Sequence, residues 1–316
     1  MSGLRGAEET FCHQAFLYQD DGDYVAGVVP FVLDGLSRGE VVAVAVPARR
    51  SHLLEKALST AAARVRFIDI EDEGRNPARL IPAVLHAFLD EHPEPVRVVG
   101  EPVWPERSGE EYAACVQHEA MVNRAFTGRR ATFLCPYEAA LGPSVLDDAE
   151  ATHPLLVDAA GVRRSRHFSP EAAYDRYNLP LPTSRDAFLV PFDIETLSKA
   201  RRVATEFAAR AGIEDERLED VALAVGEVCA NSVQHGGGHG ELAVWSDEEG
   251  VVFQVSDAGI PSSRLAGRRP PTMYRHGGRG LFLVNQVADL VRTHVAADGM
   301  TTRVRMRYDG TPRAAG

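Results

Sequence analysis

Short, mostly apolar runs alternate with stretches of helical periodicity over the first half of the chain. Uninterrupted apolar runs are typical of strands buried on both faces, whereas apolar residues three or four positions apart indicate helices. Strands that alternate with helices form a parallel sheet covered on both sides. We therefore expect a three-layer α/β domain over residues 10–157. Its predicted strands are 14–18, 41–46, 65–70, 96–101 and 131–137, and its predicted helices are 23–39, 49–63, 77–91 and 109–126.

The pattern breaks over residues 158–186, where a basic cluster at 163–166 is followed by Pro170, Pro180 and Pro182. Proline removes a backbone donor and interrupts both helices and sheets. We expect this segment to be a linker that contains one short helix.

The order of elements changes after residue 187, because strands and helices are now grouped rather than alternating. Grouped elements indicate an α+β sandwich of two layers, which we expect over residues 187–309. The predicted strands are 187–192, 241–247, 251–257, 292–298 and 301–308, and the predicted helices are 196–211, 214–234 and 280–291.

Composition narrows the class of protein. The chain has 316 residues, 45% of them hydrophobic, and a formal net charge of −11, which disfavours direct binding of nucleic acid. There is no apolar leader at the N-terminus and no apolar run of the roughly 20 residues that span a bilayer, so we expect a cytoplasmic protein without a membrane segment. Four scattered cysteines predict reduced, structural thiols: Cys12, Cys115, Cys135 and Cys229.

The predicted helix at 214–234 carries two faces. Glu227, Asn231 and His235 recur at intervals of four and lie opposite an apolar stripe, among Leu223, Ala224 and Val228. One carboxylate and one amide on a mostly apolar surface are typical of a pocket wall, although an exposed polar edge fits the same pattern. The stripe that we expect to pack on the sheet consists of Leu218, Val221, Ala222, Val225, Cys229 and Ser232.

Two motifs downstream favour the pocket. "SDAGIP" (256–261) ends a predicted strand, and "GGRGLFLVNQVAD" (277–289) opens a predicted helix with three glycines. Glycines at a helix N-terminus allow close approach of the backbone, whose N–H groups favour a phosphate. His235 and His239 could instead suggest a metal site with Glu241, but we favour helix-end and loop roles for both histidines.

The order "EVCAN", "DAG" and "GGRGLFLV" resembles the N box and the two glycine boxes of the ATP-binding fold shared by histidine kinases, Hsp90 and gyrase. "VALAVGEVCANSVQHGG" and "GRGLFLVNQVAD" resemble most closely the anti-sigma factor kinases of the RsbW/SpoIIAB type. The resemblance covers residues 187–309 and implies a Bergerat (GHKL) sandwich that binds ATP and Mg²⁺.

The resemblance also implies roles for single residues. Asn231 is expected to ligate Mg²⁺, and Glu227 to accept the proton of the attacking hydroxyl. Asp257 is expected to accept a hydrogen bond from the adenine amino group, and Gly259 to let the base approach. The other implied nucleotide-binding positions are Gly278, Gly280, Leu281, Thr301 and Thr302.

The chain departs from this family pattern at the first glycine box. Pro261 stands where a glycine is usual, and it stiffens the entry to the lid. The family uses an arginine just before the second glycine box to assist phosphoryl transfer. Arg275 is the nearest candidate, and Arg279 is the substitute.

The family resemblance predicts a Ser/Thr kinase that sequesters a sigma factor and phosphorylates an anti-anti-sigma (STAS) protein. Such kinases commonly form homodimers. A histidine kinase would need a helical hairpin with an acceptor histidine, for which 158–186 is too short. A switch that binds nucleotide without catalysis stays open, but Glu227 favours the enzyme.

The first half resembles the MEDS sensory domain, which is related to RecA/KaiC-like folds. The resemblance rests on "CHQAFLYQDDGDYVAGVVPFVLDGLSRGEVVAVAV", "FLCPYEAAL" and "THPLL", and the chain contains no P-loop motif. Tyr18, Glu101 and Tyr137 lie at the carboxyl ends of predicted strands, where open α/β sheets bind ligands, and His13 precedes the first predicted strand. We expect these four residues to line a small-molecule signal pocket. The combination of domains resembles RsbA-type anti-sigma regulatory factors of the stress response.

Overall fold

The computed structural model describes residues 11–214, 216–261, 263–270 and 279–308. The chain divides into two compact units, and each is described by itself. Unit 1 comprises residues 1–74, 87–107 and 115–175, and unit 2 comprises residues 75–86, 108–114 and 176–316. The sequence boundaries at 157 and 187 stay a prediction.

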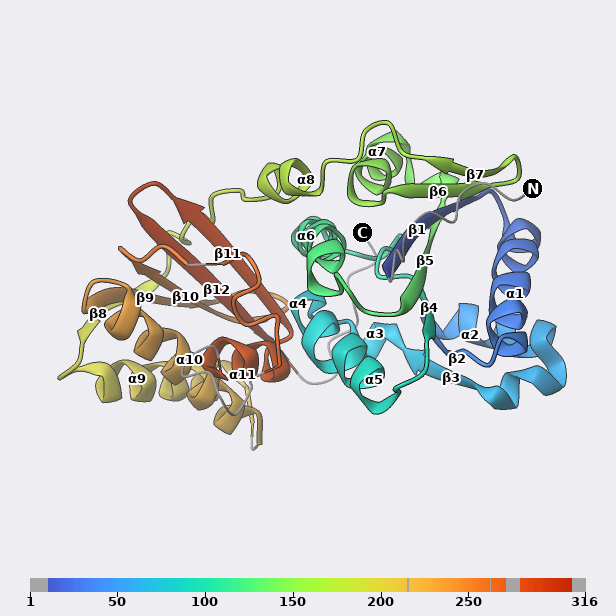
Figure 1. Cartoon of the computed structure of the whole chain (residues 1–316). Coiled ribbons are helices and arrows are strands. Elements are labelled where there is room, and N and C mark those ends of the chain that lie inside the picture. The colour runs from blue at the N-terminus through green and yellow to red at the C-terminus, as the bar shows by residue number, and fades with distance from the viewer. Residues whose placement is uncertain (1–10, 215, 262, 271–278, 309–316) are drawn as a thin grey trace. The chain divides into compact units, whose positions relative to one another are not determined.

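A seven-stranded sheet forms the centre of unit 1, in the order β3-β2-β4-β5-β1-β6-β7 (Figure 1). All neighbouring strands are parallel except β6 and β7, so the sheet is mixed rather than wholly parallel as predicted. The two additional strands escaped the sequence pattern because both are short and β7 is exposed along its whole length. The strands are β1 (Phe11–Tyr18), β2 (Val41–Val46), β3 (Val65–Asp69), β4 (Val96–Gly100), β5 (Ala131–Glu138), β6 (Leu155–Asp158) and β7 (Gly161–Arg164).

Helices lie on both faces of this sheet. The helices α1 and α2 pack on one face, where they share a hydrophobic core with β1, β2, β4 and β5. The helix α6 brings its C-terminal half to the other face. The helical elements up to the second unit's sheet are α1 (Asp21–Ser37), α2 (Ala48–Leu58), η1 (Ser59–Arg64), α3 (Ile70–Glu73), α4 (Pro77–Arg79), η2 (Leu80–Leu85), α5 (His86–Glu91), α6 (Gly109–Ala125), η3 (Ala139–Leu141), α7 (Pro143–Thr152) and α8 (Pro170–Arg176).

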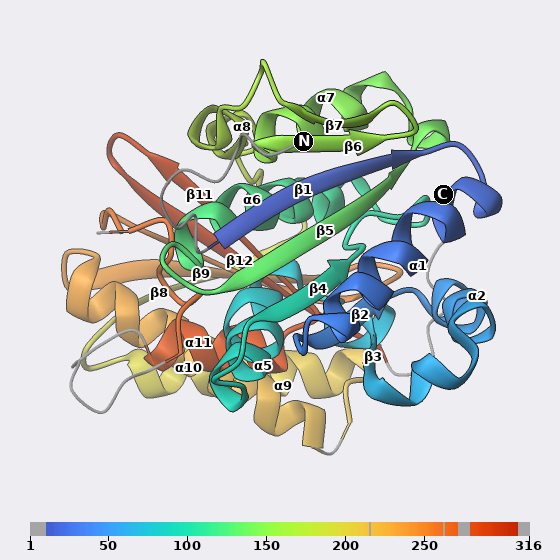
Figure 2. The ribbon, with the colours of Figure 1, turned by 45° about the vertical axis from the view of Figure 1, so that its right-hand side comes forward.

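The first strand is longer than the sequence predicted and lies near the middle of the sheet. Figure 2 shows β1, in dark blue, between β5 and β6. His13 was predicted to precede this strand but is its third residue. Because side chains alternate along a strand, His13 and Tyr18 point to opposite faces of the sheet. This alternation decides which residues of unit 1 can meet.

Unit 2 contains an antiparallel sheet of five strands in the order β11-β12-β10-β9-β8, with three helices on one face (Figure 1). The predicted two-layer α+β sandwich is therefore confirmed. The last helix ends before residue 290 because the apolar residues that follow begin β11. The elements are β8 (Phe188–Asp193), α9 (Leu197–Ala211), α10 (Glu216–His235), β9 (His239–Ser246), β10 (Gly250–Asp257), α11 (Arg279–Val287), β11 (Leu290–Ala296) and β12 (Gly299–Arg307).

The core of unit 2 joins one face of this sheet to α9, α10 and α11. Val221, Val225 and Cys229 of the predicted stripe are buried there. Ala224 and Val228 were expected beside Glu227 on the opposite side, but both belong to the same core. The buried face of α10 is therefore wider than the predicted stripe, and Glu227 lies at its margin.

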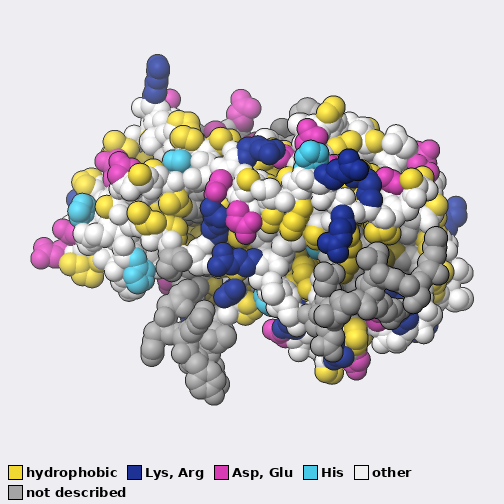
Figure 3. Space-filling model, turned by 45° about the horizontal axis from the view of Figure 1, so that its top comes forward, with side chains coloured by type: hydrophobic (Ala, Val, Ile, Leu, Met, Phe, Trp, Pro, Cys, Tyr) yellow, Lys and Arg dark blue, Asp and Glu magenta, His cyan; other side chains and the backbone are white. Residues whose placement is uncertain are grey.

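The surface carries charges of both signs. Figure 3 shows acidic and basic side chains interspersed over the visible face. Within the described ranges, no helix combines the length and the apolar character needed to cross a membrane.

Candidate functional site

The helix α10 presents Glu227 and Asn231 one turn apart in unit 2, and both residues are half-buried. The Nδ2 atom of Asn231 is buried and makes no hydrogen bond within the described part of the chain. A buried amide without a partner costs free energy, unless a ligand satisfies it. Burial of the Asn231 amide nitrogen supports the pocket-wall interpretation of this face, which stays a prediction.

The second glycine box lies directly against these two side chains. Gly280 is the second residue of α11. A Cβ atom at this position would collide with the Glu227 carboxylate and would lie 3.4 Å from Asn231 Nδ2. Leu281 packs against the hydrophobic core and so anchors the start of the helix. The absence of a side chain at residue 280 is what brings the N-terminus of α11 to the acid and the amide.

The carboxylate of Asp257 is held at the C-terminal end of β10. Its Oδ2 atom accepts a hydrogen bond of 2.6 Å from the hydroxyl of Ser232, and its Oδ1 atom accepts one of 2.7 Å from the backbone N–H of Gly259. A Cβ atom at Gly259 would lie 2.8 Å from Asp257 Oδ1 and 2.9 Å from the carbonyl oxygen of His235. Ser232 had been assigned to sheet packing alone, so its contact with the carboxylate was missed.

The two candidate threonines point to opposite faces of the sheet. Thr302 pairs with Val255, whose side chain belongs to the core beneath the helices, whereas Thr301 pairs with Ser256. Directly opposite residues of an antiparallel pair share a face, so Thr302 lies on the helix side with Asp257. The hydroxyls of Thr301 and Ser256 are 3.1 Å apart on the other side.

Several predicted residues lie outside the described part of the chain or are exposed at the surface. Arg275 and Gly278 lie outside the described residues. Arg279 is the exposed first residue of α11. His235 is exposed at the end of α10, and His239 Nδ1 is 3.2 Å from the carbonyl oxygen of Gly237, which is a local loop contact.

The four residues predicted to line a sensory pocket in unit 1 form two separate groups. Tyr18 and Tyr24 each donate a hydrogen bond to Glu101, at 3.0 and 3.1 Å. Arg50 donates to the Tyr18 hydroxyl at 2.9 Å. Burial raises the pKa of Glu101 to about 7, although Arg50 and the two hydroxyls favour its charged form. The sequence did not identify Tyr24 or Arg50, because both lie in helices.

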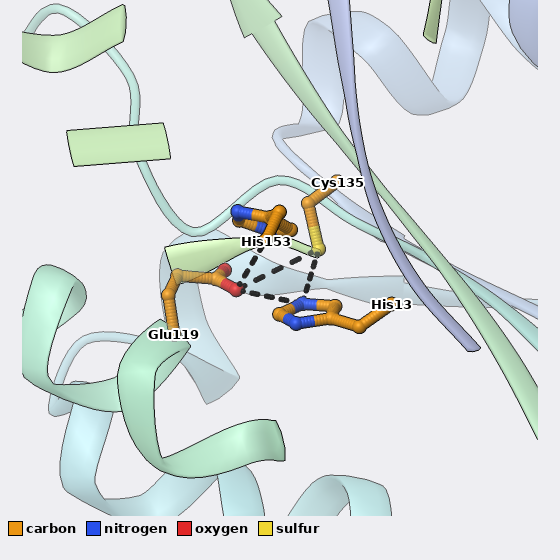
Figure 4. A group of neighbouring side chains, drawn as sticks. All are labelled: His13, Glu119, Cys135 and His153. Atoms are coloured by element: carbon orange, nitrogen blue, oxygen red, sulfur yellow. Dashed lines mark hydrogen bonds and ion pairs between the residues drawn. The ribbon is translucent and has the colours of Figure 1, made fainter. Parts of the chain in front are cut away.

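His13 and Tyr137 lie on the other face of the sheet. They gather around His153, whose ring centroid is 4.0 Å from that of His13 and 5.5 Å from that of Tyr137. Figure 4 shows that Glu119 and Cys135 complete this group. Burial and the neighbouring His153 lower the pKa of His13 to about 4. Burial alone would raise the pKa of Glu119, but the two imidazoles hold it well below its ordinary range.

Two regions of the chain match known protein families. Residues 12–154 match the MEDS family, described as the methanogen/methylotroph, DcmR sensory domain. Residues 190–308 match the histidine kinase-like ATPase domain.

Individual relatives match the second region. The serine-protein kinase RsbW of Listeria monocytogenes is 33% identical over 120 residues, which are 33% of this chain and 76% of the relative. RsbW of Halalkalibacterium halodurans is 31% identical over 114 residues, which are 32% of this chain and 70% of the relative. A crystal structure of the RsbU and RsbW domains of a Mycobacterium tuberculosis protein aligns at 20% identity and a TM-score of 0.30, over 40% of this chain and 33% of that chain.

The buried Asn231 amide, the glycine at the start of α11 and the fixed Asp257 carboxylate lie within the region that matches these kinases. The chain thus belongs to the RsbW serine-protein kinase family through its C-terminal histidine kinase-like ATPase domain, to which a MEDS domain is joined as in RsbA-type anti-sigma regulatory factors.

Proposed function

We propose that this protein is an ATP-dependent Ser/Thr kinase and anti-sigma factor whose activity responds to a signal at the MEDS domain. The observation that best supports kinase activity is the close approach of Gly280 to Glu227 and Asn231, because it combines an acid, a buried amide nitrogen without a partner in the described residues and a helix N-terminus. The amide oxygen of Asn231 fits Mg²⁺, which takes hard oxygen ligands. When bound, Mg²⁺ neutralises charge on the phosphate oxygens.

The residues of the chain take the following roles in this proposal. Glu227 accepts the proton of the attacking Ser or Thr hydroxyl. Asp257, oriented by Ser232 and the Gly259 N–H, accepts a hydrogen bond from the adenine amino group. The backbone N–H groups at the start of α11 contact phosphate, and Arg279 is exposed beside them to assist transfer. Thr302 contributes on the adenine side.

The relatives named RsbW support the proposed partners, which are a sigma factor and a small anti-anti-sigma (STAS) protein as the substrate. We further infer that the protein works in the cytoplasm, where both partners occur, and that it forms homodimers. The mixed sheet of unit 1, parallel except at one edge, supports a RecA/KaiC-like relationship for the sensory domain.

Titration calorimetry with Mg-ATP tests the nucleotide site on the full chain. Wild type and Gln234→Ala, an exposed change on the same helix, should bind, whereas Asn231→Ala should not. Glu227→Gln should bind Mg-ATP but fail to transfer phosphate to candidate STAS proteins. Equal binding by Asn231→Ala would contradict the metal role, and equal transfer by Glu227→Gln would contradict the base.

A switch that binds nucleotide without catalysis is the second candidate. Pro261 favours it, because its ring restricts the backbone two residues after Gly259, where the lid begins. ATP-dependent capture of a sigma factor without phosphate transfer to any STAS protein would support this candidate over the kinase.

A further inference from the structure

The interior of unit 1 holds four polar side chains that converge on one point. We propose that His13, Glu119, Cys135 and His153 form a zinc site. The four side chains come from β1, α6, β5 and the residue after α7, and all four are buried. Their potential ligand atoms lie within 4.8 Å of one another (Figure 4).

The spacing of these atoms fits a tetrahedral ion. His13 Nε2 lies 3.0 Å from Glu119 Oε2, and His153 Nε2 lies 3.3 Å from the same oxygen. Cys135 Sγ lies 3.4 Å from His13 Nε2 and 3.7 Å from Glu119 Oε2. Tetrahedral zinc with ordinary bond lengths separates such ligands by about 3.3 to 3.6 Å. Small shifts of the side chains would therefore admit the ion.

The hydrogen bonds behind the two imidazoles direct their lone pairs inward. His13 Nδ1 lies 3.2 Å from Asn123 Oδ1. The orientation of that amide is fixed, because Asn123 Nδ2 donates to the carbonyl oxygen of Thr152 at 2.7 Å. His153 Nδ1 lies 2.9 Å from the carbonyl oxygen of Ala149. Both Nδ1 atoms thus donate a hydrogen bond, and in the tautomer that this allows the Nε2 atom of each ring faces the centre and is free to bind an ion.

This arrangement leaves acceptors facing one another unless a cation lies between them. His153 Nε2 makes no hydrogen bond within the described residues, despite its short distance to the Glu119 carboxylate. A buried carboxylate also needs a counter-charge. Zn²⁺ bound to one thiolate, one carboxylate and two neutral imidazoles gives a site without net charge. On binding, the ion replaces the thiol proton of Cys135, which is released to solvent.

The donor set favours zinc over harder ions, because thiolate and imidazole suit borderline metals, whereas Mg²⁺ and Ca²⁺ take oxygen ligands. Four protein ligands are typical of a structural zinc site. An open groove of about 820 Å³ borders the cluster and is lined by Phe11, His13, Asn123 and Phe168, among others. Of the four proposed ligands, His13 lines this groove.

Zinc content of the full chain tests the proposal. The protein is purified without metal, incubated with Zn²⁺, desalted and analysed by mass spectrometry for bound metal. We expect about one zinc ion per wild-type chain and a large loss in Cys135→Ser and Glu119→Gln. The matched control is Cys115→Ser, which changes another buried thiol of unit 1 and should retain zinc.

Cobalt substitution gives a second readout on the unmutated chain, in case the variants do not fold. Co²⁺ at this site should show the intense visible bands of tetrahedral coordination and a thiolate-to-cobalt charge-transfer band, both unchanged in Cys115→Ser. A wild-type chain that retains no zinc and gives only the weak spectrum of octahedral cobalt would overturn the site and leave a buried His–Glu ion pair. Full zinc retention by folded Cys135→Ser and Glu119→Gln would also overturn it.

Discussion

Gly280 lies so close to the Glu227 carboxylate that even a methyl group at residue 280 would displace the acid. The Glu227 side chain is flexible, so Gly280→Ala should disturb its position more than the fold. Misplacement of a reacting group by about 1 Å can lower a rate about a hundredfold. We expect a fall of that order in phosphate transfer, with a change in the free energy of unfolding below about 1 kcal/mol.

The control for this prediction is Gly226→Ala in α10, next to the proposed base. A Cβ there would meet only the Arg201 side chain, at 3.3 Å. Alanine is the better helix former, so this variant should be more stable by about 0.5 to 1 kcal/mol and should retain its activity. Equal activity of the two variants in a transfer assay would contradict the importance of the Gly280 contact.

Ser232→Ala should weaken binding of ATP specifically. The hydroxyl donates to Asp257 at 2.6 Å, and loss of a hydrogen bond to a charged group corresponds to about tenfold or more in affinity. Binding of GTP, whose base lacks the adenine amino group, should change little. Calorimetric titration with both nucleotides checks this, with Ser256→Ala as the control on the opposite face of the sheet. A parallel loss of both affinities would show that Asp257 does not recognise the base.

Thr301 and Thr302 lie on opposite faces of the sheet, so substitution of each in turn tests which face binds the adenine. Thr302→Val, on the helix side with Asp257, should raise the Kd for ATP by about threefold to tenfold. Thr301→Val, which faces Ser256, should leave the Kd unchanged. The reverse result, measured by the same titration, would mean that the adenine lies elsewhere.

Glu101 should make unit 1 less stable as the pH rises. Its pKa is about 7 in the folded chain, above the ordinary 4.5, so the folded state holds a proton that the unfolded state has lost. The contribution of this proton to the free energy of unfolding is therefore largest below about pH 4.5. It declines as the pH rises to about 7, by about 3 kcal/mol at most. Glu101→Gln removes the titration, so this variant should gain stability relative to wild type between about pH 5 and about pH 8.

Denaturant unfolding followed by tryptophan fluorescence measures this effect. The two tryptophans lie in different units, so a Trp245→Phe background leaves Trp104 as the reporter of unit 1. Glu94→Gln, at an exposed turn, is the matched control and should follow the wild-type pH profile. A Glu101→Gln profile parallel to wild type would show that Glu101 is charged in the folded chain throughout this range.

The sequence was informative wherever one periodicity dominated. Apolar spacing predicted the strands and helices of unit 2 in their observed order, because each element buries one continuous face. It missed β7, whose side chains are all exposed and therefore give no apolar pattern. It also extended the last helix into β11, since a short apolar run fits both structures.

Residue spacing alone grouped only site residues that are close in sequence, whereas Asp257 and Gly280 were added through the family resemblance. Glu227 and Asn231 share one helix face, so their spacing marks them together. His13, Cys135 and His153 come from separate elements, and the apolar spacing that predicted the helix of Glu119 did not single out this residue. Their meeting depends on the pairing of β1 with β5 and β6, which no local spacing encodes.

That pairing also constrains how the chain can fold during synthesis. Phe11 pairs with Ala131, and Gln14 pairs with Leu155. The strand β1 is synthesised first and can pair only after β5 and β6 have been synthesised. Contacts of such long sequence separation slow folding, because the loop entropy is lost before the pairing compensates for it. Until β5 and β6 are available, the unpaired apolar β1 is a candidate for chaperone binding. Deletion of β1 would split the sheet into β3-β2-β4-β5 and an isolated β6-β7 hairpin, which leaves no route to a folded sensory domain.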